Sequence, residues 1–96
     1  MSNLLISCET KSPEQNNREV IQAIQSLGEC VKISESFWYV RSAKSAADAL
    51  IVVSKACDPN NIVCVVDATN EVIALDTTAP LEATGAIRHN WNKESA

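Results

Sequence analysis

CVKISESFWYVRS, residues 30–42, is the segment that decides the fold of this 96-residue chain. It contains two runs rich in β-branched and aromatic side chains, residues 30–34 and 37–42, around the short polar link SES. Such side chains favour strands, and a short polar link between two runs of them favours a hairpin. The segment therefore predicts the second and third strands of an antiparallel sheet.

A first strand is predicted before the hairpin, over residues 3–9, NLLISCE. Successive side chains of a strand point to opposite faces of a sheet. One face carries Leu4, Ile6 and Cys8, and the other carries Leu5, Ser7 and Glu9. Glu9 therefore stands at the end of the strand, on the second face.

A helix is predicted between this strand and the hairpin, from Ser12 to Leu27. Ser12 is the expected N-cap, Pro13 suits the first helical position, and Gln15 completes a capping box. Apolar residues then recur at spacings of three and four, which predicts one buried stripe made of Val20, Ile21, Ile24 and Leu27. Gly28 follows where a left-handed helix stop is expected.

A second helix and a fourth strand are predicted after the hairpin. The helix starts at Ser45, and Asp58-Pro59-Asn60-Asn61 ends it. Its expected packed face carries Ala46, Ala49 or Leu50, Val53 and Cys57. The fourth strand covers residues 62–66. A turn at residues 68–70 then leads to a short fifth strand over residues 72–75.

The predicted order of elements is β, α, β, β, α, β, which indicates the α+β class. Two interlocked βαβ units satisfy this order when the antiparallel sheet is ordered 4-1-3-2 and both helices lie on one face. We therefore expect a ferredoxin-like sandwich over residues 1–76. Residues 77–96 show weak periodicity and are interpreted as a semi-ordered tail, in which Leu81, Ile87 and Trp91 could dock on the domain.

Composition and charge indicate a cytoplasmic protein outside the membrane. The start of the chain lacks the basic residues and the apolar core of a signal peptide, and no apolar run approaches the 18 or so residues that span a bilayer. We expect the four cysteines to be reduced, with Cys8 and Cys64 buried as small apolar residues. The net charge of −4 disfavours nucleic acid, although a local basic patch could override it.

The fourth strand, IVCVV, is apolar on both faces, and residues 72–75 repeat the pattern. In a 4-1-3-2 sheet this strand is an edge strand, whose apolar side chains need a cover. We expect a second copy of the chain to supply it, through an interface formed by Leu5, Val63, Val65, Val72, Ile73 and Leu75. The alternative is that the tail folds back over the same face.

Few residues are candidates for chemistry. From the end of the first strand, Glu9 could bind a divalent cation or polarise water, and in a symmetric dimer two Glu9 side chains could form a pair of carboxylates. Asp67 is expected at the opposite end of the sheet from Glu9. His89, the only histidine, lies in the predicted tail. Trp38 and Tyr39 could stack on bases, but their apolar neighbours favour positions in a core or an interface.

Several short segments resemble a known family. These are NLLISCE at residues 3–9, the Pro13 that follows, SFWYV at 36–40 and DATNE at 67–71. They resemble the SinR-like proteins, in the superfamily of VapD toxins and of the small ferredoxin-like subunit of the CRISPR spacer-acquisition complex. The resemblance covers residues 3–76 in order and spacing. It implies a βαββαβ fold and a homodimer in which a fifth strand crosses to the partner.

The resemblance also implies, for some members, metal-dependent cleavage of RNA or DNA. Such families end the first strand in Tyr-Asp, whereas this chain has Cys8-Glu9, so Glu9 is the residue that would be catalytic and would hold Mg²⁺ or Mn²⁺. Its side chain has one more methylene than aspartate, which displaces the carboxylate. Two hypotheses follow: a homodimeric, degenerate metal-dependent endoribonuclease, and a non-catalytic dimeric adaptor that binds another protein. The sequence leaves open whether the protein is an enzyme.

Overall fold

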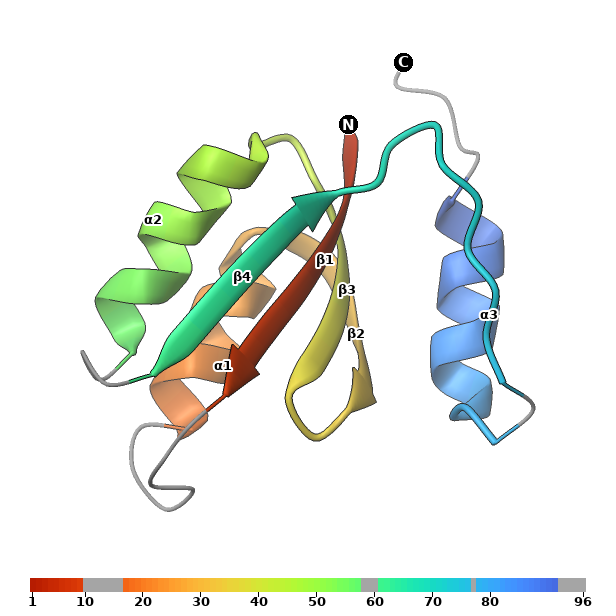
Figure 1. Ribbon diagram of the computed structural model, residues 1–96, viewed down its shortest axis with the longest axis horizontal. Helices are drawn as coiled ribbons and strands as arrows, with labels where there is room; N and C mark the ends of the chain where they lie inside the picture. The colour runs from red at the N-terminus through yellow and green to blue at the C-terminus, as the bar shows by residue number, and fades with distance from the viewer. Residues whose placement is uncertain (10–16, 58–60, 77, 92–96) are drawn as a thin grey trace.

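The computed structural model describes residues 1–9, 17–57, 61–76 and 78–91, and over these the chain has the α+β architecture predicted from the sequence (Figure 1). The elements are β1 Ser2–Glu9, α1 Asn17–Ser26, β2 Gly28–Ser34, β3 Phe37–Ser42, α2 Ala46–Ala56, β4 Ile62–Asp67 and α3 Leu81–Asn90. The four strands form one antiparallel sheet in the order β2-β3-β1-β4, which reads β4-β1-β3-β2 from the other edge. This arrangement is compatible with a ferredoxin-like fold. Within the described residues, no helix is long and apolar enough to cross a membrane.

Helices α1 and α2 lie on one face of the sheet (Figure 1). The predicted stripe of α1 is confirmed: Val20, Ile24 and Leu27 are buried, and Ile21 packs against the same core. From the sheet, this core takes Leu4, Ile6, Cys8, Trp38 and Val40. The capping box predicted at Ser12, Pro13 and Gln15 lies outside the described residues, as does the predicted helix end at residues 58–60.

Two local signals around the helices have different outcomes. Ser45 is the N-cap of α2, as predicted, and its hydroxyl accepts a hydrogen bond of 3.1 Å from the backbone N–H of Asp48. Gly28 is the first residue of β2 rather than a left-handed helix stop, and its φ is +152°. A Cβ atom there would lie 2.1 Å from the carbonyl oxygen of Arg41, so the close approach of β3 requires glycine.

The fifth strand predicted at residues 72–75 is not formed, and that expectation was wrong. After β4 the chain turns at Asn70, whose φ is +74°, and residues 71–76 leave the sheet and run beside α3 (Figure 1). We call residues 71–76 the strap. Ile73 and Leu75 pack against the cluster that α3 forms with the sheet, so packing on a helix rather than strand pairing covers them.

Residues 81–90, which the sequence placed in the tail, form α3 on the face of the sheet opposite α1 and α2 (Figure 1). The helix lies against β2 and β3. Ile87 and Trp91 form a second buried cluster with Tyr39 and Ala68, and Leu5, Val31 and Ile33 pack around it. The tail therefore covers part of the face for which a second copy was expected, and the β4 side of that face stays open.

Candidate functional site

A buried polar cluster fixes the C-terminal end of α3 to the sheet. Asn3 is its centre: the side-chain amide donates to the carbonyl of Trp91 at 2.7 Å, and its oxygen accepts from the Tyr39 hydroxyl at 2.7 Å and from Arg41 at 3.1 Å. Arg41 also donates to the carbonyl of Asn90 at 2.8 Å. The last carbonyls of a helix lack partners within the helix, so this cluster caps α3.

The remaining members of the cluster join α3 to β2, and burial keeps Tyr39 protonated. The Asn90 side-chain amide donates to the Glu29 carboxylate and, at 2.9 Å, to the carbonyl of Ala86. Burial raises the pKa of the Tyr39 hydroxyl, and the neighbouring Arg41 guanidinium offsets part of that rise. The hydroxyl therefore stays a donor to Asn3 at neutral pH. This cluster was not predicted from the sequence, although polar Asn3 and Arg41 on strand faces were a signal for it.

Trp91 connects α3, the strap and the sheet. Its ring lies 5.6 Å from that of Tyr39, with an angle of 38° between the planes, and its indole N–H donates to the carbonyl of Glu71 at 2.7 Å. Tyr39 is therefore buried under α3, whereas Trp38 points into the core below α1 and α2. Both aromatic residues occupy core positions, in agreement with the interpretation from the sequence.

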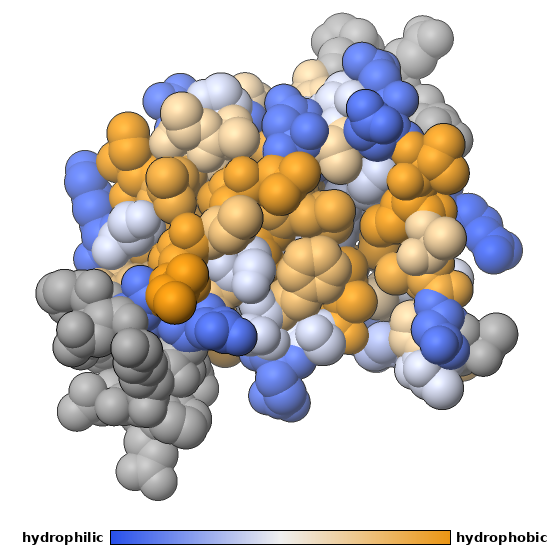
Figure 2. All heavy atoms as spheres, viewed as in Figure 1, coloured by the Kyte–Doolittle hydropathy of each residue, from blue (hydrophilic) through white to orange (hydrophobic). Residues whose placement is uncertain are grey.

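The β4 edge of the sheet keeps apolar side chains uncovered. Alternate side chains of β4 point to the α3 face, and α3 does not reach them: Ile62 is 61% exposed, Val66 is 49% exposed and Cys64 is also exposed. We call these three side chains the edge patch. Figure 2 looks onto this edge and shows hydrophobic residues gathered over α2, β4 and the strap, with hydrophilic residues mostly at the margins.

Glu9 is exposed at the end of β1, on the same face as the edge patch, because it pairs in the sheet with Ile62. Asp67 pairs with Leu4, five positions along β4 from Ile62, which is roughly 16 Å at the rise of a strand. The expectation that the two carboxylates lie at opposite ends is confirmed. Asp67 accepts hydrogen bonds from the Thr69 backbone at 3.0 Å and hydroxyl at 2.6 Å, which lower its pKa. Asp67 therefore stabilises the turn after β4.

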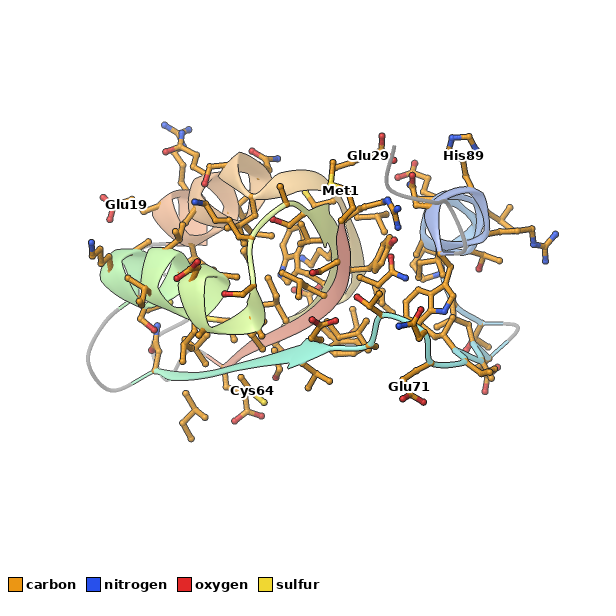
Figure 3. All side chains as sticks on the ribbon, turned by 90° about the horizontal axis from the view of Figure 1, so that it is seen from above. Met1, Glu19, Glu29, Cys64, Glu71 and His89 are labelled. Carbon is orange, nitrogen blue, oxygen red and sulfur yellow. The ribbon has the colours of Figure 1, made fainter. Side chains whose placement is uncertain are left out.

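The other candidates for metal binding or acid–base chemistry lie apart from Glu9. His89 is exposed on α3, and Figure 3 shows its side chain pointing away from Cys64 and Glu71. Among the described residues, no three His, Cys, Asp or Glu side chains are close enough to hold a metal ion. Within the part of the chain that the structure describes, Glu9 is thus a single carboxylate, and a carboxylate pair formed from these residues would need a second copy.

The predicted interface residues fall into two groups. Val63 and Val65 are half-buried against the core under α2, whereas Leu5, Ile73 and Leu75 are half-buried around the Tyr39 and Trp91 cluster. Val72 is 95% exposed on the outside of the strap. The chain's own helices therefore partly cover five of these six side chains.

The cysteines differ in their surroundings. Cys8 is buried as predicted, and its sulfur lies 3.4 Å from that of Cys57 at the end of α2. Burial and this contact raise the pKa of Cys8 to about 12, so its thiol stays protonated. Cys64 was expected to be buried and is exposed, because it points to the face of β4 that α3 leaves open; Figure 3 shows it on the outside of β4.

A cavity of about 360 Å³ lies between the strap and α3. Its lining is mostly apolar, with one acidic and one basic side chain: Glu71, Val72, Ile73, Leu75, Thr84, Ile87, Arg88 and Trp91. Exposed apolar cavities of this kind commonly receive a ligand or a partner side chain. Because α3 was not predicted, this cavity was not predicted from the sequence either.

No protein-family model matches the chain, and neither a curated protein nor a solved structure matches it. The resemblance to the SinR-like proteins stays a prediction. The function is therefore inferred from the edge patch, Glu9 and the cavity between the strap and α3.

Proposed function

We propose that this chain is a non-catalytic, homodimeric adaptor that binds another protein. The observation that carries the proposal is the apolar surface of the β4 edge and the strap, which stays exposed although α3 packs on the same face of the sheet. Continuous apolar surfaces on soluble domains mark interaction sites. The acidic balance of the chain, a net charge of −4, suits a protein partner better than a phosphate backbone.

In this proposal, the polar side chains that form hydrogen bonds within the chain stabilise the fold and do not bind the partner. Asn3, Arg41 and Asn90 hold the end of α3, and Asp67 holds the turn after β4. The cavity between the strap and α3 offers a partner an apolar side-chain site next to the exposed Val72. Glu71 and Arg88 at its wall can fix the orientation of a peptide, because they present one charge of each sign.

The adaptor proposal predicts that Val72→Asp loses a protein partner. Val72 is 95% exposed, so the folded chain tolerates aspartate, whereas a charge facing an apolar partner weakens binding at least tenfold, or about 1.4 kcal/mol. Tagged wild type should retain a protein from the host lysate in a nuclease-treated capture experiment, and Val72→Asp should retain much less. Leu81→Asp is the matched control: Leu81 is 88% exposed and lies outside the cavity lining.

A second candidate function is the metal-dependent cleavage of RNA, and Glu9 favours it. The carboxylate is exposed on the part of the sheet that α3 leaves open, so a nucleic acid or a second copy could reach it. In this candidate, Glu9 of each copy holds Mg²⁺ or Mn²⁺. The site needs the two carboxylates side by side, and hence a dimer that joins the open faces of two sheets.

The nuclease candidate predicts cleavage that Glu9→Gln abolishes. Glutamine keeps the size of the side chain and removes the charge that a hard cation requires. Purified protein should be incubated with RNA and with single- and double-stranded DNA in Mg²⁺ or Mn²⁺, with EDTA as the blank. A loss of at least a hundredfold in Glu9→Gln supports the candidate, while Glu71→Gln, at the cavity, should cleave like wild type. Equal cleavage by Glu9→Gln removes this mechanism.

A further inference from the structure

We infer that two copies of the chain pair antiparallel along β4, with a two-fold axis that passes between their Cys64 residues. This inference deepens the proposed function, on whose homodimer it rests, by naming the surface and the register. β4 is the edge of the sheet, so among the described strands only β1 pairs with it. A second copy of β4 can extend the sheet through backbone hydrogen bonds, as edge strands do.

The backbone groups of β4 that face outward follow from the ladder with β1. The N–H of Ala68 donates to the carbonyl of Asn3 at 2.8 Å, which makes these two residues a hydrogen-bonded pair. Bonded and non-bonded pairs alternate along an antiparallel ladder. Ile62, Cys64 and Val66 therefore direct their backbone groups to β1, and Val63 and Val65 direct theirs to the free edge.

The register follows from these outward groups and from the apolar pattern. In a symmetric antiparallel pair, the outward backbone groups of Val63 and Val65 must form their hydrogen bonds with the outward backbone groups of the second copy's β4. Pairing Val63 with Val65 of the second copy places Cys64 opposite Cys64 and Ile62 opposite Val66. All five residues of IVCVV then face apolar partners, and Asp67 lies opposite Asn61. A shift of this register by two positions in one direction places Asp67 opposite a valine of the second copy. A shift by two positions in the other direction places Asn61 opposite a valine.

The surface around β4 is large enough for such a dimer. Figures 1 and 2 look down the shortest axis of the molecule onto the β4 edge, and the face in view measures 34 × 30 Å between Cα extremes. β4 is about 20 Å long. An interface of that length that reaches α2 on one side of the strand and the strap on the other, roughly 25 Å wide, covers roughly 500 Å² on each copy. Both copies then bury about 1,000 Å², the lower limit of specific interfaces.

Charge also allows this contact. Residues 62–66 carry no charged side chain, and in the proposed register no charged residue of β4 faces a like charge of the second copy. Leu50 of α2, the helix that packs on β4, is exposed and uncharged as well. The occupant that fits the register, the apolar pattern and the charge of this edge is another copy of the edge itself.

This pairing differs from the dimer that the nuclease candidate needs. The two β1 strands would be three strand spacings apart, roughly 14 Å. Glu9 lies beside Ile62, two residues from the axis, so the two Glu9 residues are also separated by roughly 13 Å along the strands. Their carboxylates therefore cannot share a metal ion in the β4 dimer.

The first test is the oligomeric state of Cys64→Lys by sedimentation equilibrium. The Cys64 side chain is exposed, so lysine is compatible with the folded chain, and it places two like charges opposite each other at the axis. Wild type and Leu81→Lys should dimerise alike, and Cys64→Lys should dimerise with at least a tenfold higher Kd. A Cys64→Lys dimer as tight as wild type overturns the pairing.

The second test is a cross-link by oxidised glutathione. Two Cys64 thiols lose their protons and give two electrons to one oxidised glutathione, which forms one disulfide between copies and releases two reduced glutathiones. We expect a covalent dimer with a Cys64–Cys64 peptide in wild type and in Cys57→Ser, and none in Cys64→Ser. A wild-type dimer that never yields this peptide overturns the register. Neither failure affects partner capture at Val72, so the adaptor proposal is judged separately.

Discussion

Asn3→Ala is expected to lower the free energy of unfolding by about 3 kcal/mol. Asn3 is buried and joins three groups, so alanine leaves the Tyr39 hydroxyl and the Trp91 carbonyl without their partner in the interior. Each buried polar group that loses its hydrogen bond costs roughly 1–3 kcal/mol. Urea unfolding followed by circular dichroism measures the change. Hydrogen exchange should show faster opening of α3 than of β1, because the lost contacts join the two.

Ser7→Ala is the matched control for this change. Ser7 lies on the same face of the same strand, four residues from Asn3 and outside the polar cluster. Its replacement should alter the free energy of unfolding by less than about 0.5 kcal/mol. If Asn3→Ala is as mild as Ser7→Ala, the end of α3 is held by its apolar contacts alone.

The parts of the fold that local patterns determine could be predicted from the sequence. Alternation defined β1, the Ser45 cap defined the start of α2, and three- and four-residue spacing defined the buried stripe of α1. Each of these signals lies within a few residues of the element that it specifies. The hairpin is similar, because the link SES joins two runs that pair directly with each other.

Helix α3 escaped prediction because its stability depends on residues far away in the sequence. Its buried side chains Ala83, Ile87 and Trp91 follow one stripe, but Leu81 is exposed and Gly85 weakens the helical pattern. The groups that cap its end, Asn3 and Arg41, lie 88 and 49 residues from their carbonyl partners. The fifth strand was predicted wrongly for the same reason, since Ile73 and Leu75 pack against a cluster that includes α3.

The candidate site was predicted only in part. The position of Glu9 at a strand end and its distance from Asp67 followed from strand direction alone. The sequence indicated that the apolar sheet needs a cover, and α3 supplies one over β2 and β3. The side chains of the edge patch on β4 stay exposed.

Trp91→Ala should be the most destabilising of the proposed substitutions and should lower the free energy of unfolding by about 3–5 kcal/mol. The ring is buried against Tyr39, and its N–H fixes the strap through Glu71, so alanine leaves a cavity and frees two segments at once. The total free energy of unfolding of a domain of this size is only about 5–15 kcal/mol.

Leu81→Ala is the control that distinguishes the destabilisation by Trp91→Ala from a general sensitivity of α3 to the loss of an apolar side chain. It removes an apolar side chain from the same helix, but Leu81 is exposed, so the urea midpoint should hardly move. Trp91→Ala should also expose the apolar face formed by Leu5, Val31 and Ile33, and a dye that fluoresces on apolar surfaces should bind the variant in the absence of urea. If Trp91→Ala unfolds at the wild-type midpoint and binds no dye, α3 does not cover the sheet in solution. The face behind it would then be a second apolar surface, and the β4 edge would no longer be the preferred interface.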